Sequence, residues 1–168
     1  MVGNSVVNRD TFKVTTPSDQ DIEMTRLFDA PRHLVFEAMT EPEHVKQWWG
    51  RLGEGYSVPV CEIDLRPGGT WRFVNRHPKG EAAFQGEYRE VTPPSRLVFT
   101  EIYEPFPDGI SVVTADFADE GGKTRFTATV RYPSLEVRDM VLASGMARGA
   151  GISYDRLEDV VAELHREP

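Results

Sequence analysis

The stretch SLEVRDMVLASGMARGAGISYDRLEDVVAEL, residues 134–164, decides the fold of this chain. Its apolar or small residues recur every three or four positions, which predicts a helix with one stripe against an apolar surface. Ser134 is placed to cap the helix, and Glu136 suits the positive end of its dipole. The stripe comprises Leu142, Met146, Gly149, Ser153, Leu157, Val160, Val161 and Leu164, whereas Arg148, Asp155, Arg156, Glu158 and Glu163 fall off it.

Three glycines interrupt this stretch, at positions 145, 149 and 151. Each costs about 1 kcal/mol relative to alanine in a helix interior. One interpretation is a break near Gly145 between a short and a long helix, together with close packing on a sheet. The other is that the missing side chains leave room for a ligand between helix and sheet. Both can hold at once.

The upstream sequence predicts the surface that this helix covers. Strands are expected at 11–16 and 21–28, followed by a helix from Pro31 and a second over 41–49. Apolar residues then alternate with period two as far as position 132, with turns between the runs, which predicts consecutive antiparallel strands. The predicted fold is α+β: a curved antiparallel sheet around a long C-terminal helix, with two short helices after the first strands.

Length and charge limit the organisation and the partners. The 168 residues fit one domain over 11–168, preceded by a flexible polar tail at 1–10. A net charge of -8 disfavours nucleic acid as a partner. A single cysteine, Cys61, excludes an internal disulfide and fits a buried structural thiol in a reducing compartment. No signal peptide or membrane-spanning run is recognisable, so we expect a cytoplasmic protein.

Several separated motifs resemble one superfamily, in the same order along the chain. They are RLFDAP at 26–31, TEPEH at 40–44, WWG at 48–50, DLRPGG at 64–69, GEYREVTPPSRLVFT at 86–100, and Gly145-Met146 with Gly149. These residues resemble the START-related helix-grip superfamily, and within it the family named after the activator of the heat-shock chaperone ATPase. The resemblance implies an antiparallel sheet gripping the C-terminal helix with an apolar cavity between them. Such relatives bind lipids, sterols, polyketides or plant metabolites, some catalyse polyketide cyclisation or dehydration, and a few assist chaperones.

Strand parity selects the side chains expected to face the helix. Aromatic residues concentrate on one parity of the strands, where they either fill a core or line a cavity. Trp48 and Trp49 end a short helix, and we expect one in the core and one at the rim. The predicted ligand-binding residues are Trp49, Trp71, Phe73, Phe84, Tyr88, Phe99, Glu101, Tyr103, Phe117, Phe126, Met146 and Gly149.

A few polar residues share that parity. Asn75, His77 and Glu101 would give an apolar site the polar contacts typical of small-molecule pockets. For His77, which precedes a proline at a strand end, a solvated loop position is favoured. Asp64 and Arg66 should face outward and stabilise the following Gly-Gly turn. The histidines have no metal-ligand spacing, and we predict no catalytic constellation, metal or cofactor.

These observations favour the binding of a hydrophobic or aromatic small molecule between helix and sheet. The first alternative is an enzyme of the polyketide cyclase or dehydratase kind, with Glu101, His77 or Tyr88 moving protons. A third is a chaperone- or protein-interaction module, which predicts a solid core and an exposed apolar patch. A homodimer is compatible with the sequence.

Overall fold

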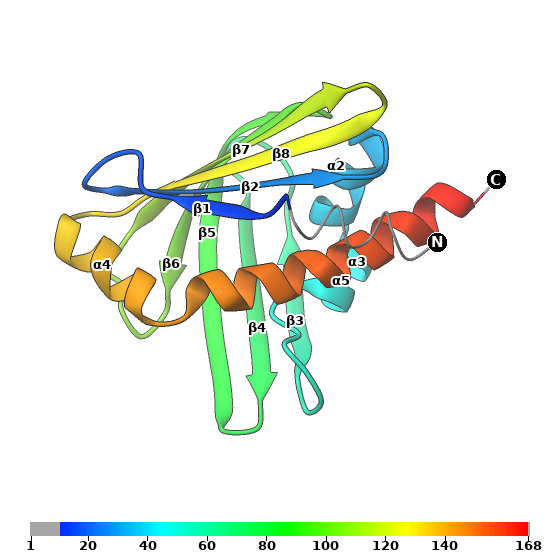
Figure 1. Cartoon of the computed structure of the whole chain (residues 1–168). Coiled ribbons are helices and arrows are strands. Elements are labelled where there is room, and N and C mark those ends of the chain that lie inside the picture. The colour runs from blue at the N-terminus through cyan, green and yellow to red at the C-terminus, as the bar shows by residue number, and fades with distance from the viewer. Residues whose placement is uncertain (1–10, 168) are drawn as a thin grey trace.

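A computed structural model describes residues 11–167 and confirms the predicted α+β helix-grip fold. The tail predicted at 1–10 lies outside this range. Within it, eight strands form one antiparallel sheet in the order β1-β2-β8-β7-β6-β5-β4-β3, which curves around the helix α5 (Figure 1). The elements are β1 (Lys13–Thr15), β2 (Asp21–Phe28), α2 (Arg32–Thr40), α3 (Pro42–Trp48), β3 (Ser57–Ile63), β4 (Thr70–His77), β5 (Gly80–Thr92), β6 (Arg96–Tyr103), β7 (Ser111–Glu120), β8 (Lys123–Arg131), α4 (Leu135–Ala143) and α5 (Met146–Arg166).

The C-terminal stretch folds as two helices, so the predicted break is confirmed. Gly145 separates α4 from α5 with a φ of 83°, a left-handed conformation that glycine adopts without steric cost. The hydroxyl oxygen of Ser134 accepts a hydrogen bond from the backbone N–H of Val137, as expected for the cap of α4. Figure 1 shows α4 near one end of the sheet and α5 running across it.

Side chains fill the space at the C-terminal end of α5. There α2 and α3 pack against the helix, and Leu157 and Val161 of α5 are fully buried with Val35 of α2. Phe28, at the end of β2, belongs to the same core. This solid part of the interior holds the helix on the sheet.

A buried ion pair joins β2 to α5. Arg26 is fully buried, and its guanidinium lies 2.7 Å from the carboxylate of Asp155 and 3.7 Å from that of Glu158. The same guanidinium sits 5.1 Å from the centre of the Phe28 ring. Glu158 is buried even though it falls off the predicted apolar stripe. The helix buries a carboxylate there because β2 supplies its counter-charge.

Candidate functional site

A cavity of about 460 Å³ lies between the first turns of α5 and the sheet. Met146, Gly149, Ala150, Ser153 and Tyr154 of α5 line one side of it. The other walls come from β2 and β4 to β8, and from the end of α3 with the loop that follows. The wall is mainly apolar and aromatic, so the space suits an apolar molecule better than a cluster of water.

Most residues that the sequence predicted for the site lie on this wall. Eleven of the twelve line the cavity: Trp49, Trp71, Phe73, Phe84, Tyr88, Phe99, Glu101, Phe117, Phe126, Met146 and Gly149. Alternation along the strands carried these assignments. The register shift in β5 falls between Tyr88 and Glu90, beyond the residues in question, so it leaves their parity unchanged. Whether these side chains contact a ligand stays a prediction.

Tyr103 is the exception, and its assignment to the cavity wall is corrected. It pairs with Phe84 across β5 and β6, and the two rings lie 5.2 Å apart. Its side chain is therefore on the predicted face of the sheet. Tyr103 is, however, the last residue of β6, lies beyond the cavity and is 41% exposed. His77 also lies off the wall, at the end of β4, where its Nδ1 accepts a hydrogen bond from the backbone of Lys79.

A hydrogen bond across β5 fixes the position of Trp71 in the cavity wall. The indole N–H of Trp71 donates to the carbonyl of Thr100 at 3.1 Å, across the strand β5. Gly86 lies between them, and a Cβ at this position would approach the carbonyl oxygen of Thr100 to 1.8 Å and Trp71 Nε1 to 2.5 Å. Only glycine fits here, which gives a physical reason for the first residue of the GEYR motif. The ring of Trp71 is thereby held 5.7 Å from that of Phe99.

A second set of contacts ties the loop after α3 to α5. The backbone N–H of Gly50 donates to the hydroxyl of Ser153 at 3.1 Å, and Asn75 donates its side-chain amide to the Gly50 carbonyl at 2.8 Å. Gly50 has a φ of 64°, so it takes the left-handed conformation that this close approach requires. Beside it, Trp48 is buried in the core, as expected for one of the two tryptophans, and Trp49 packs on Phe73 at 5.1 Å. Both line the cavity, and a rim position for Trp49 stays a prediction.

Four ionisable side chains line the cavity: Glu101, Tyr88, Tyr132 and Tyr154. Glu101 lies on β6, and burial raises the pKa of its carboxyl to about 7. Tyr132, just after β8, and Tyr154 of α5 have raised pKa values, first because of burial and second because of the nearby charge of Glu101. Arg26 opposes this effect at Tyr154. Burial also raises the pKa of Tyr88. The cavity therefore combines a carboxyl that titrates near neutrality with three phenols that stay protonated.

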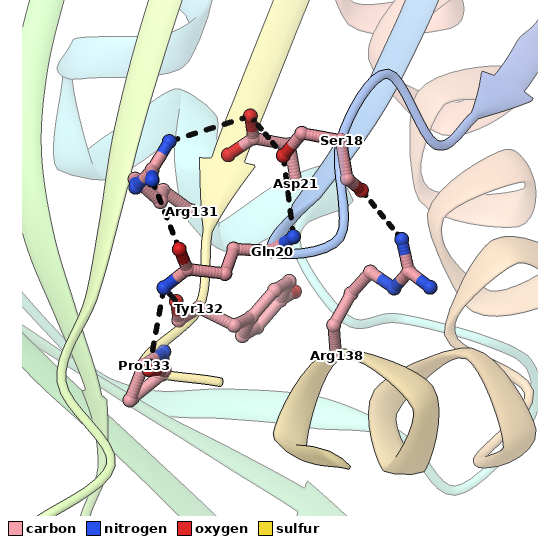
Figure 2. Close-up of polar contacts among 7 residues, drawn as sticks. All are labelled: Ser18, Gln20, Asp21, Arg131, Tyr132, Pro133 and Arg138. Atoms are coloured by element: carbon pink, nitrogen blue, oxygen red, sulfur yellow. Dashed lines mark hydrogen bonds and ion pairs between the residues drawn. The ribbon is translucent and has the colours of Figure 1, made fainter. Parts of the chain in front are cut away.

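Polar contacts behind the cavity fix the position of Tyr132 (Figure 2). The side-chain amide of Gln20 donates to the carbonyl of Tyr132 at 3.0 Å, and its oxygen accepts from Arg131 at 2.9 Å. The carbonyl of Ser18 accepts a hydrogen bond from Arg138 of α4. These contacts join the β1–β2 loop, the end of β8 and α4, so that the tyrosine ring extends from a fixed strand end.

Some wall residues were not singled out from the sequence. Tyr132 continues the alternation of Phe126, Ala128 and Val130, so parity could have placed it. Tyr154 lies three residues before Leu157, which is helical spacing, and this signal could have added it to the stripe. The hydrogen bond between Gly50 and Ser153 joins positions 103 residues apart and has no signal in a single sequence.

Other predicted features lie away from the cavity. Arg66 pairs with Asp64 at 3.0 Å on the surface, before the turn, as expected. Cys61 is half-buried, less than predicted, and burial raises the pKa of its thiol to about 11. Within residues 11–167, no group of three or more His, Cys, Asp or Glu side chains is placed to hold a metal ion, and every helix is too short or too polar to cross a lipid bilayer.

A curved antiparallel sheet closed over a cavity by a C-terminal helix defines a protein of the helix-grip class. The chain belongs to the family described as Activator of Hsp90 ATPase homolog 1-like protein, whose profile matches residues 29–162. This confirms the resemblance drawn from the motifs.

Solved structures from several bacteria have the same fold. A protein from Rhodobacter sphaeroides is 28% identical, with a TM-score of 0.82 over 91% of this chain and 99% of that one. One from Mycobacterium smegmatis is 25% identical, with a TM-score of 0.75 over 93% and 99% of the two chains. An AHSA1-like protein from Aeromonas hydrophila is 20% identical, with a TM-score of 0.66 over 87% and 97%. A search of curated proteins finds no match.

Proposed function

We propose that the protein binds a hydrophobic or aromatic small molecule in the cavity between α5 and the sheet. The observation that carries this proposal is the cavity itself, about 460 Å³ with a mainly apolar wall. Ligand pockets typically enclose about 300–1,000 Å³ and combine apolar walls with few polar groups. Each 100 Å² of apolar ligand surface removed from water would contribute about 2.5 kcal/mol before the costs of ordering the ligand.

The helix glycines offer a matched test. A Cβ at Gly149 would make only an ordinary contact, 3.7 Å from Leu52, so Gly149→Leu can place its side chain in the cavity without a backbone clash. Gly151 is a second glycine of α5, off the cavity wall, where a Cβ would lie 3.5 Å from Phe12. Gly151→Leu therefore makes the same change in helix propensity without filling the cavity.

Native mass spectrometry of freshly purified protein, followed by titration with the neutral dye Nile red, tests the proposal. We expect a retained small molecule that denaturation releases, and dye binding that Gly149→Leu abolishes and Gly151→Leu preserves. A protein that carries no small molecule and binds no dye, or dye binding equal in both variants, would contradict the proposal.

A second candidate is proton-transfer catalysis on the bound molecule, as in polyketide cyclases and dehydratases. The observation that favours it is Glu101, whose carboxyl lines the cavity with a pKa near neutrality, the range in which general acid–base groups are most effective. Tyr88 also lines the cavity, whereas His77 does not, so His77 is removed from the set proposed from the sequence. The cavity also weakens the case for an interaction module, which predicted a solid core.

Hydrogen exchange on a model ketone tests this candidate. The Glu101 carboxylate would take a proton from the carbon next to the carbonyl of 2-tetralone and return a deuteron acquired from heavy water. Nuclear magnetic resonance would then show protein-dependent deuterium incorporation that Glu101→Gln removes. Exchange no faster than in buffer, or unchanged in the variant, would reject the catalytic role.

A further inference from the structure

Among the residues that the structure describes, none supplies a counter-charge to Glu101. It lies in mid-strand on β6, two residues from Phe99 on the same face, where an apolar residue would fit the wall. In the part of the chain that the structure describes, its carboxyl makes no hydrogen bond or ion pair, and burial is the sole cause of its raised pKa. Desolvating a carboxylate without a partner is costly, so a ligand that brings a counter-charge to Glu101 is favoured over one that does not.

No Lys, Arg or His side chain of residues 11–167 lines the cavity around Glu101. Tyr132 from the end of β8 and Tyr154 from α5 are near enough to feel its charge, and β5 contributes the phenol of Tyr88 to the same cavity. On β7, Ser111 bonds to the backbone carbonyl of Glu101 and not to its carboxyl. Arg26 acts on Tyr154 but is already paired with two carboxylates of α5.

Aromatic faces lie next to this carboxyl. Phe99 precedes it on the same face, and Trp71 packs on Phe99 while its indole N–H bonds to the residue before Glu101. Aromatic faces attract cations, and desolvation strengthens the attraction. A fatty acid or other anion would instead meet the charge of Glu101 within a protein of net charge -8. A neutral ligand would leave the carboxylate without a counter-charge.

We propose that the cavity selects a hydrophobic molecule carrying a protonated amine, whose ammonium group pairs with Glu101. This inference rests on the proposed function and specifies its ligand class. The phenol oxygens of Tyr132 and Tyr154 are available to accept the remaining N–H donors, because neither makes a hydrogen bond within residues 11–167. The charge pair would form on a mainly apolar wall, where screening by water is weak.

Three probes that share one ring system separate the possibilities. 9-(Aminomethyl)anthracene, 9-anthracenemethanol and 9-anthracenecarboxylic acid differ in the charge of one substituent, and their binding at pH 8 can be followed by the fluorescence of the tryptophans in the wall. We expect the amine to bind at least tenfold more tightly than the alcohol, and the acid most weakly. Glu101→Gln should remove this preference, while the exposed Glu87→Gln, on β5, should keep it.

The amine should also bind about tenfold more weakly at pH 6 than at pH 8, because Glu101 with a pKa of about 7 is then mostly protonated while the amine stays charged. Equal binding of amine and alcohol would overturn this inference and leave the proposed function in place. A preference for the amine that survives Glu101→Gln would overturn it as well. If none of the three probes binds while Nile red does, this inference alone fails; if Nile red does not bind either, both proposals fail.

Discussion

Replacing Glu101 by glutamine should change how the stability of the protein depends on pH. Burial raises the pKa of this carboxyl from the ordinary value of 4.5 to about 7. That difference corresponds to about 3 kcal/mol between the protonated and ionised forms in the folded protein. Glutamine keeps the shape of the side chain but cannot ionise. The variant should therefore lack the loss of stability that ionisation of Glu101 causes in the wild-type protein at high pH.

The sign follows from proton binding. Between pH 4.5 and pH 7 the folded state holds the Glu101 proton and the unfolded state has released it. The free energy of unfolding of the wild-type protein therefore falls as pH rises through this window, relative to that of the variant. The favourable contribution is fully present below pH 4.5 and is lost above pH 7.

Urea denaturation of both proteins at pH 4.5, 6 and 8 measures this difference. We expect the variant to gain about 3 kcal/mol on the wild-type protein between the lowest and the highest pH, or about 6–10 °C in Tm. The comparison across pH cancels the constant effect of introducing an amide. Glu87→Gln, an exposed change on β5, serves as the control. A gap between Glu101→Gln and wild type that stays constant with pH would refute the reasoning.

Three further substitutions test the scaffold. Arg26→Met should lower the free energy of unfolding by about 3–5 kcal/mol, because it removes the cation that pairs with Asp155 and with the buried Glu158, and adding Glu158→Gln should recover part of the loss in urea denaturation. Gly145→Ala should cost about 1 kcal/mol in thermal unfolding, since alanine is strained at a φ of 83°. Gly86→Ala should cost about 3 kcal/mol and shift tryptophan fluorescence, because its Cβ would collide with the Thr100 carbonyl.

Periodicity predicted the fold and most of the cavity wall. Alternation with period two depends only on the pleat of a strand, so it assigned Phe73, Phe99 and Phe126 to the helix-facing side before any coordinates. The same rule failed at Tyr103 because it carries no information on where a strand leaves the cavity. The helix break at Gly145 was predicted because glycine is unfavourable in the interior of a helix.

Long-range pairing could not be predicted in this way. Asp155 and Glu158 fall off the apolar stripe, and a single sequence does not show that Arg26, about 130 positions earlier, lies opposite them. The volume of the cavity could not be predicted either, because it depends on how completely the aromatic side chains fill the space between the helix and the sheet. The motifs conveyed the fold through resemblance, without specifying a ligand.

The two halves of α5 differ in what surrounds them. Leu157 and Val161, in the C-terminal half of the helix, are buried in the packed core, and the ion pair with Arg26 holds the middle of the helix. The first turns, from Met146 to Gly149, line the cavity. We therefore expect substitutions in those first turns to change the binding of the proposed ligand while the packed core, and with it the stability of the fold, is retained.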